Sequence, residues 1–303
     1  MLNTAGNKGR LALGAAVVGV ALALSGCAQG DPLSPTEGSG STDTIVVGSQ
    51  AYYSNEIVAE IYAQALENAG YDVERSFQIG QRDAYLPALE AGEVDVFPEY
   101  TGNLLQYYAP DTTATQSDEV YAALADALPD ALAVLDQSTA SDQDSYTVTQ
   151  EFADANSLSA IGDLANVDGV VLGGPPELEE RPYGPSGLES VYGVTVSFEA
   201  TGDTTFDALI EGVVDVANIY TADPRIQTSG LVTLDDPEGL FLASNVVPLV
   251  NADLADELAS VLDPVSAALT ADGLIALNVQ SVEDQLSSAQ IATEWLTANG
   301  FLG

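Results

Sequence analysis

The stretch from Ala88 to Thr101 reads ALEAGEVDVFPEYT, and the stretch from Ala208 to Thr221 reads ALIEGVVDVANIYT. The two share the pattern A-L-x-x-G-x-V-D-V-x-x-x-Y-T. Each copy predicts the end of a helix, a glycine at its C-terminus, a short buried strand and a tyrosine where that strand stops. Because ligands of open α/β sheets bind beyond the carboxyl ends of the strands, we expect two lobes that direct Tyr100 and Tyr220 at one crevice. The alternative is a common helix-to-strand junction in which the matching Tyr-Thr is coincidental.

Around these copies, predicted strands and helices alternate, which indicates an α/β fold. The first helix is expected to begin at an N-cap on Ser54 and to end before Gly70. Further helices are predicted at 83–91, 103–108, 118–128, 158–164, 252–269 and 282–299. Strands are predicted at 44–49, 71–79, 93–96, 134–135, 170–172, 194–198, 213–217 and 231–234.

The predicted chain path crosses twice between two lobes, near residues 138–146 and again near residues 241–247. Lobe I would then comprise residues 44–140 and 246–303, and lobe II residues 141–245. Two crossings form a hinge, and hinge closure around a ligand is a recurrent property of two-lobed binding proteins.

The N-terminus has the pattern of an export signal, predicted to span residues 1–26. Lys8 and Arg10 precede an apolar run over residues 11–24. The Leu-Ser-Gly-Cys sequence that ends at Cys27 is similar to the lipobox of bacterial lipoproteins, which implies a lipid attached to Cys27 and a chain anchored at the extracytoplasmic face of the membrane. A membrane-spanning anchor is the alternative, although the apolar run is shorter than the roughly 20 residues that a bilayer requires. Residues 27–43 have the composition of a flexible tether.

The chain is strongly acidic, with 46 Asp and Glu residues against six Lys and Arg and a formal net charge of −40. Beyond residue 26 the basic residues are Arg75, Arg82, Arg181 and Arg225. Nucleic acids and anionic lipid surfaces are bound through many Lys and Arg side chains. Both are therefore excluded as partners, and contact with a membrane is expected through the lipid anchor alone.

The absence of histidine removes the commonest proton-transfer group, and Cys27 is the single cysteine. Histidine-based catalysis, thiol chemistry and ordinary zinc sites are thereby excluded, so we expect no enzyme, no metal and no cofactor. Acidic pairs remain as weaker candidates. Two pairs do not match a calcium-binding loop and are expected to be solvated: Asp142 with Asp144, and Asp235 with Asp236. A third pair, Asp95 with Glu99, has the residue types of a glycosidase acid–base pair.

Tyrosine is the most frequent aromatic residue, with thirteen copies against seven phenylalanines and one tryptophan. Three or four tyrosine faces can surround a quaternary ammonium group, which donates no N–H hydrogen bond. Predicted strand ends and turns hold Tyr52, Tyr53, Tyr100, Tyr146, Tyr183 and Tyr220, whereas helical packing is expected for Tyr62, Tyr85, Tyr107, Tyr108 and Tyr121. A ligand carboxylate would need donors, for which Arg82, Arg225 and the helix N-terminus at Thr101 are candidates. Surface salt bridges are the alternative role for both arginines.

Several motifs together resemble the osmoprotectant-binding lipoproteins of ABC importers, which bind glycine betaine, choline, carnitine and related amines. They are Gly48-Ser-Gln-Ala-Tyr52, Ala65-Leu-Glu-x-x-Gly-Tyr71, Glu99-Tyr-Thr-Gly102, Asp144-Ser-Tyr146, Asn218-Ile-Tyr-Thr-Ala-Asp223 and Asn245-Val-Val-Pro248. The resemblance covers residues 44–303 and implies a two-lobed type II periplasmic-binding-protein fold. It also implies an inter-lobe cage in which Tyr100 and Tyr220 are joined by Tyr52 and Tyr146. The chain departs from the family at Tyr53-Ser54, where Thr-Glu is frequent, and at Asn103, where threonine is usual.

The sequence thus predicts a monomeric solute receptor that delivers a quaternary-ammonium osmolyte to a permease and its ATPase. The predicted ligand-binding residues are Tyr52, Tyr100, Thr101, Tyr146, Tyr220, Arg82 and Asp83. One alternative is a receptor for another small solute, such as an amino acid. The other is a surface lipoprotein that serves interaction rather than transport.

Overall fold

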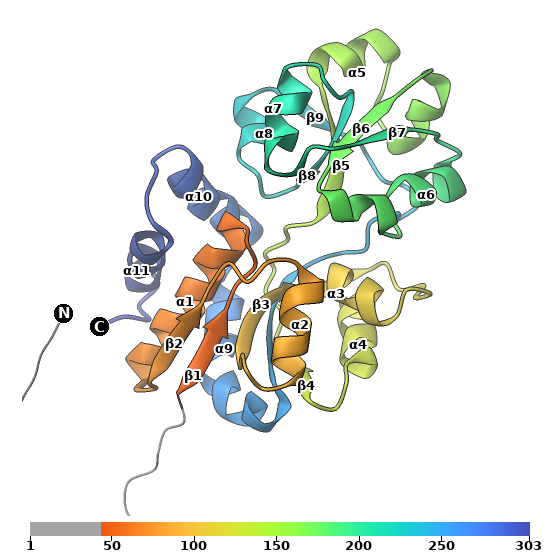
Figure 1. Cartoon of the computed structure of the whole chain (residues 1–303). Coiled ribbons are helices and arrows are strands. Elements are labelled where there is room, and N and C mark those ends of the chain that lie inside the picture. The colour runs from red at the N-terminus through yellow and green to blue at the C-terminus, as the bar shows by residue number, and fades with distance from the viewer. Residues whose placement is uncertain (1–43) are drawn as a thin grey trace, which may run out of the picture. The chain divides into compact units, whose positions relative to one another are not determined.

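The computed structural model describes residues 44–303, which contain two five-stranded sheets with helices on both faces (Figure 1). The predictions of a signal peptide over 1–26, of lipidation at Cys27 and of a tether over 27–43 lie outside the described residues. We call the part of the chain built on the first sheet lobe I and the part built on the second sheet lobe II. Their order along the chain is lobe I, lobe II and lobe I again.

Lobe I contains the sheet β2-β1-β3-β10-β4, in which β2, β1 and β3 are parallel and β10 is antiparallel to both of its neighbours. Side chains alternate between its faces: Val96 packs in one apolar cluster, with α1, α9, α10 and α11, and Phe97 packs in the other, with α2, α3 and α4. The strands are β1 (Ile45–Gly48), β2 (Val73–Ser76), β3 (Val96–Tyr100), β4 (Leu132–Val134) and β10 (Val246–Asn251). The helices are α1 (Tyr53–Ala69), α2 (Arg82–Glu90), α3 (Thr101–Tyr108), α4 (Ser117–Ala127), the short η5 (Ala252–Leu254), α9 (Ala255–Ala268), α10 (Ala271–Val282) and α11 (Ser288–Ala298).

Lobe II repeats this strand pattern in the sheet β7-β6-β8-β5-β9, where β7, β6 and β8 are parallel and β5 is antiparallel to β8 and β9. The strands are β5 (Asp144–Thr149), β6 (Val171–Gly174), β7 (Ser197–Ala200), β8 (Val216–Tyr220) and β9 (Leu231–Thr233). The α-helices are α5 (Gln150–Asn156), α6 (Pro185–Gly187), α7 (Thr205–Ile210) and α8 (Arg225–Thr228). Short helical turns occur at η1 (Ile161–Asn166), η2 (Pro176–Glu180), η3 (Leu188–Tyr192) and η4 (Gly202–Thr204).

Two crossing segments connect the lobes and pair with each other in antiparallel fashion. Ser141 and Asn245 form an isolated bridge between them, and the Val246 N–H donates to the Ala140 carbonyl at 2.9 Å. Gly102, at the start of α3, lies against the second crossing, where a Cβ atom would come within 2.7 Å of the Ala243 carbonyl oxygen. A glycine is therefore required where the first lobe meets the crossing.

The internal repeat is the same structural unit in both lobes. Gly92 and Gly212 both have φ = +70° after their helices, a backbone conformation that favours glycine. The aspartate of each V-D pair accepts a hydrogen bond at 2.9 Å from the neighbouring parallel strand, Asp95 from Val46 N–H and Asp215 from Val171 N–H. The pattern therefore encodes a helix end, a turn and a side-chain hydrogen bond to the neighbouring parallel strand, β1 in lobe I and β6 in lobe II.

The predicted strands of the two copies, 93–96 and 213–217, each begin three residues too early and also end too early, because β3 continues to Tyr100 and β8 to Tyr220. Pro98 argues against a strand interior because it lacks an N–H group. In the antiparallel pairing of β3 with β10, however, Pro98 lies opposite Pro248, so neither strand has to donate a backbone N–H at that position. Strand β3 therefore continues to Tyr100.

Other element predictions also need correction. Strands β5 and β10 and helices α5, α6, α8 and α10 were not predicted, and the helix expected at 158–164 is a 3₁₀ turn that begins at Ile161. Helix α1 begins at Tyr53 with no side-chain cap, rather than after a cap on Ser54. Among the described residues no single helix is long and apolar enough to cross a membrane; residues 252–282 reach that length only as two helices bent by 86°.

Candidate functional site

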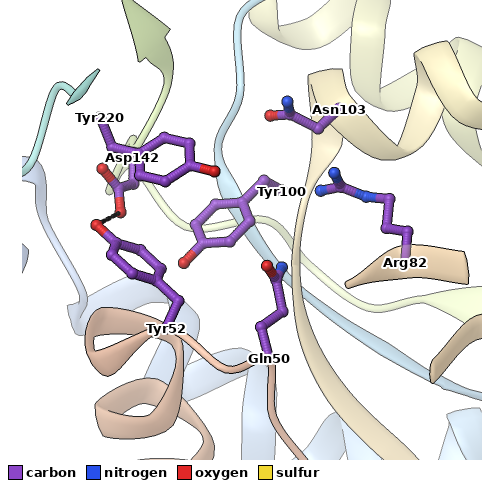
Figure 2. A pocket seen from close by; sticks show the side chains of 7 residues that line it. All are labelled: Gln50, Tyr52, Arg82, Tyr100, Asn103, Asp142 and Tyr220. Carbon is purple, nitrogen blue, oxygen red and sulfur yellow. Dashed lines mark hydrogen bonds between the residues drawn. The ribbon is translucent and has the colours of Figure 1, made fainter. Parts of the chain in front are cut away.

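Seven side chains from both lobes and the first crossing line a small pocket (Figure 2). Lobe I contributes five, from the end of β1, the start of α1, α2 and α3, and the end of β3; the crossing contributes an aspartate and β8 a tyrosine. They are Gln50, Tyr52, Arg82, Tyr100, Asn103, Asp142 and Tyr220. The free space among them is about 10 Å³, close to the minimum for one water molecule. Gln50, Tyr52 and Tyr220 also line a wider cleft of about 750 Å³.

Three tyrosines form the aromatic part of the pocket. The ring centroids of Tyr52 and Tyr220 lie 5.0 Å apart with the rings tilted by 48°, and the ring of Tyr100 lies beside them (Figure 2). Tyr220 is the last residue of β8 and Tyr100 the last of β3, so the repeated unit delivers one ring from each lobe. Burial raises the pKa of all three hydroxyls well above its ordinary value, so the rings stay neutral phenols.

Asp142 brings a carboxylate to these rings from the first crossing. Its Oδ2 accepts a hydrogen bond from the Tyr52 hydroxyl at 3.1 Å, and its Oδ1 accepts one from the Ala222 N–H at 3.0 Å. Burial raises the pKa of Asp142 to about 7; these hydrogen bonds lower it, and Asp144 and Asp223 raise it further. Ionisation of Asp142 near neutral pH therefore depends on what occupies the pocket.

Asn103 links lobe I to lobe II at the opposite side of the pocket. Its Nδ2 donates to Asp144 Oδ2 at 2.6 Å and to the Tyr183 hydroxyl at 3.2 Å, while its Oδ1 accepts from Ser244 Oγ at 2.8 Å. Asp142 and Asp144 are only 2% and 3% exposed. The prediction that these two carboxylates are solvated is therefore wrong, because the crossing runs between two packed lobes rather than over a surface.

Arg82 reaches the pocket through a buried ion pair with Glu99. Its Nε and Nη2 donate to the two oxygens of Glu99 at 2.9 and 2.8 Å, a bidentate arrangement. Glu99 also accepts from the Tyr85 hydroxyl and, at 2.7 Å, from the Tyr100 N–H. Glu99 thus holds both Arg82 and Tyr100 in place. Asp95 is bonded to β1 instead, so these two carboxylates do not form the acid–base pair considered from the sequence.

Gln50 supplies a hydrogen-bond donor that no described residue accepts. Gln50 is 7% exposed, and its Nε2 has no hydrogen-bond partner within residues 44–303. The backbone N–H of Gln50 donates to Asn55 Oδ1 at 2.9 Å, which fixes the turn after β1. A buried donor without a partner is costly, so an acceptor is expected at this position when the pocket is filled.

Comparison with known proteins identifies the family to which this chain belongs. Residues 43–298 match the family model described as the substrate-binding domain of ABC-type glycine betaine transport systems. The chain is a member of that family. It is 28% identical over 278 residues to the glycine betaine-binding protein YehZ of Escherichia coli, covering 85% of this chain and 91% of the relative. It is 22% identical over 291 residues to the carnitine transport binding protein OpuCC of Listeria monocytogenes, covering 92% and 93%.

Solved structures agree on the fold. A structure of apo YehZ aligns with a TM-score of 0.63 at 26% identity, over 86% of this chain and 99% of that one. A glycine betaine/carnitine/choline ABC transporter structure aligns with a TM-score of 0.70 at 19% identity, over 85% and 99%. The predicted type II periplasmic-binding-protein fold is thus confirmed. The family consists of extracytoplasmic solute-binding proteins that work with a permease and an ATPase, so this substrate-binding protein is not an enzyme.

Four of the predicted site residues line the pocket of this substrate-binding protein: Tyr52, Tyr100, Tyr220 and Arg82. Three do not. Tyr146 lies inside β5 rather than at the crossing, with its hydroxyl donating to the Tyr183 carbonyl and its ring packed on Phe241. Thr101 is buried and accepts at Oγ1 from the Asn245 N–H at 3.0 Å, so it ties α3 to the second crossing. The side chain of Asp83 is exposed on α2.

Gln50, Asn103 and Asp142 line the pocket and were not among the predicted site residues. Gln50 and Asn103 lie inside or next to the motifs G-S-Q-A-Y and E-Y-T-G, so proximity to a motif was the available signal. No sequence signal marked Asp142, because the spacing of acidic residues does not show whether a segment that crosses between lobes is buried. Arg225 lies in the wider cleft. Its Cζ is 4.3 Å from the Phe206 ring centroid, and its Nη2 forms an ion pair with Asp223 Oδ2 at 2.6 Å.

Proposed function

We propose that this substrate-binding protein captures a quaternary-ammonium osmolyte that also carries a carboxylate, such as glycine betaine. The observation that carries the proposal is the convergence of Tyr52, Tyr100 and Tyr220 with the Asp142 carboxylate on one enclosed pocket. Ring faces attract a cation through their quadrupoles, and the attraction is stronger where water is excluded. The carboxylate supplies the compensating charge.

The hydrogen bonds already made in the pocket favour a quaternary cation over an amino acid. Glu99 already accepts four hydrogen bonds, two at each oxygen, and Asp142 accepts two, so few acceptor sites remain for further N–H donors. A primary ammonium group needs acceptors for three N–H donors, whereas a trimethylammonium group needs none. The ring faces and the charge of Asp142 therefore suit a cation without N–H groups.

The donors of the pocket favour a carboxylate at the other end of the ligand. Gln50 Nε2 is unpaired within the described residues, and the guanidinium of Arg82 points toward the same space (Figure 2). Together they match a carboxylate better than the hydroxyl of choline, which gains less from a positive charge. The named solutes of the two relatives, glycine betaine and carnitine, have this combination of groups.

Ligand entry requires the aromatic residues to move. A trimethylammonium group is much larger than the free space of about 10 Å³, so the Tyr52 and Tyr220 rings, 5.0 Å apart, must separate. These rings belong to different lobes, so hinge motion at the crossings provides the separation. The wider cleft beside them is the route of entry.

Calorimetric titration of residues 28–303 with glycine betaine, carnitine, choline and histidine tests this assignment. We expect heat from glycine betaine or carnitine, weaker binding of choline and none of histidine. Binding of histidine alone would favour the amino-acid receptor. No binding of any small solute in a wider panel would favour the interaction lipoprotein.

Removal of one cage ring is expected to weaken binding of the quaternary amine by roughly 2- to 30-fold, since each contact contributes about 0.5 to 2 kcal/mol. Tyr100→Ala and Tyr220→Ala test it in calorimetry, and Tyr220→Phe should retain affinity because the ring remains. Tyr107→Ala is the matched control, since this tyrosine is 38% exposed on α3 and does not line the pocket. Equal affinity of all four variants would contradict the cage.

We also propose that the protein is a monomer held at the outer face of the membrane by a lipid on Cys27. The support is the Leu-Ser-Gly-Cys sequence after the apolar run of residues 11–24. Mass spectrometry of the protein from bacterial membranes is expected to find an acylated N-terminal Cys27. Recovery of a chain that retains residues 1–26 would contradict the anchor.

A further inference from the structure

The contact between helix α10 and the loop after β8 joins the two lobes outside the ligand pocket. Asn278 of α10 is fully buried, and its Nδ2 donates to the Ala222 carbonyl at 3.0 Å. Ala222 belongs to lobe II by its place in the chain, yet its methyl group packs within the apolar cluster of lobe I. One residue of lobe II is thus docked in the core of lobe I.

The loop that carries Ala222 is also bonded to the first crossing. The Ala222 N–H donates to Asp142 Oδ1 at 3.0 Å, and Thr221 and Gln143 exchange two hydrogen bonds, at 2.9 and 3.0 Å. Tyr220, whose ring lines the pocket, immediately precedes Thr221. The position of the Tyr220 ring is therefore coupled to the docking of Ala222 against α10.

The bond to the Ala222 carbonyl is the one hydrogen bond that the Asn278 side chain makes within residues 44–303. The side chain lies beside the buried Leu274 and Leu277, and its Oδ1 has no hydrogen-bond partner within residues 44–303. A leucine would fill this space without the unpaired Oδ1, but it would leave the Ala222 carbonyl without its donor whenever the loop is docked. The favourable contribution of the amide is therefore its single bond to lobe II, and that bond exists only when the loop is docked.

We infer that Asn278 is a positioning residue that raises ligand affinity by favouring the closed arrangement of the lobes, without contacting the ligand. The inference rests on the proposed function, because it assumes that the ligand binds between Tyr52 of lobe I and Tyr220 of lobe II. Loss of the bond lowers the population of the closed state, and the apparent affinity falls by the same factor. One buried hydrogen bond corresponds to about a tenfold change.

Asn278→Leu tests the inference by removing the donor while retaining the volume of the side chain. We expect glycine betaine to bind about tenfold more weakly in calorimetry and to dissociate faster in stopped-flow measurements. Asn68→Leu is the matched control, because Asn68 Nδ2 donates to the Phe301 carbonyl at 2.9 Å within lobe I. Unchanged affinity in a folded Asn278→Leu variant would overturn the inference. If that variant does not fold, Ala222→Gly tests the same docking, with a several-fold loss expected and no loss overturning it.

Inter-lobe distances separate a failure of this inference from a failure of the proposed function. Residues 28–303 contain no cysteine, so Glu119→Cys with Glu189→Cys places one spin label on an exposed position of each lobe. We expect Asn278→Leu to shift the distance distribution toward longer values even without any solute. If the unaltered chain binds no quaternary amine but the shift occurs, the proposed ligand is wrong and the role of Asn278 in closure stands. An identical distribution in both chains would overturn that role.

Discussion

Glu99→Ala is expected to lower the free energy of unfolding by about 3–5 kcal/mol, because it leaves the buried Arg82 without a counter-charge. Glu99 is fully buried and accepts two hydrogen bonds from Arg82, one from the Tyr85 hydroxyl and one from the Tyr100 N–H. Burial of an unpaired guanidinium is unfavourable at any pH, since it does not lose its proton. For a domain of this size the melting temperature should fall on the order of 10 °C, measured by calorimetry or circular dichroism.

A surface ion pair provides the matched control for this variant. Arg75 donates to Glu67 at 2.6 Å, and the Glu67 side chain is 42% exposed. Glu67→Ala should therefore change the free energy of unfolding by less than about 1 kcal/mol. The double variant Arg82→Met with Glu99→Met should be less destabilised than Glu99→Ala, because no unpaired charge remains. Equal effects of Glu99→Ala and Glu67→Ala would show that Glu99 does not act through burial of its partner.

The internal repeat explains why the fold was largely predictable from the sequence. Gly92 and Gly212 share the same positive φ, and Asp95 and Asp215 make the same bond to a parallel strand. These are local interactions with clear residue preferences, so one pattern locates a helix end, a turn and a strand in each lobe. The fold then follows from two copies and two crossings.

Properties that depend on partners far along the chain were not predictable in the same way. The strand status of Pro98 depends on Pro248, 150 residues later, and no local pattern reveals that the two are paired. Tyr146 resembles a site residue by its neighbours in sequence, but the start of β5 at Asp144 places it inside lobe II. The aspartate at 142 gives the opposite case: it looks like one of many surface carboxylates until the lobes enclose it.

The affinity for a quaternary amine is expected to fall as the pH decreases below about 7. Burial raises the pKa of Asp142 to about 7 in the protein, with Asp144 and Asp223 adding to the rise and hydrogen bonds from Tyr52 and Ala222 opposing it. A bound cation favours the ionised carboxylate, so binding lowers this pKa and releases a proton wherever Asp142 was protonated. Between the pKa values of the free and bound forms the affinity changes by up to tenfold per pH unit. Calorimetric titration between pH 5.5 and 8.5, in two buffers of different ionisation enthalpy, measures both the affinity and the released proton.

Asp142→Asn is expected to separate the contribution of this carboxylate to binding from its effect on stability. The variant should bind glycine betaine on the order of tenfold more weakly at pH 8, and its affinity should no longer depend on pH, because the amide neither carries a charge nor exchanges a proton.

The effect of Asp142→Asn on stability has the opposite sign. The folded-state pKa of Asp142 lies above the ordinary value, so the native chain holds more protons than the unfolded chain between about pH 4 and 7. The free energy of unfolding therefore falls as the pH rises through that range. Above pH 7 the ionised carboxylate lowers stability, and Asp142→Asn should unfold at a higher temperature than the unaltered chain while binding less ligand. A variant that lost both stability and affinity at pH 8 would show instead that Asp142 is needed for its hydrogen bonds to Tyr52 and Ala222 rather than for its charge.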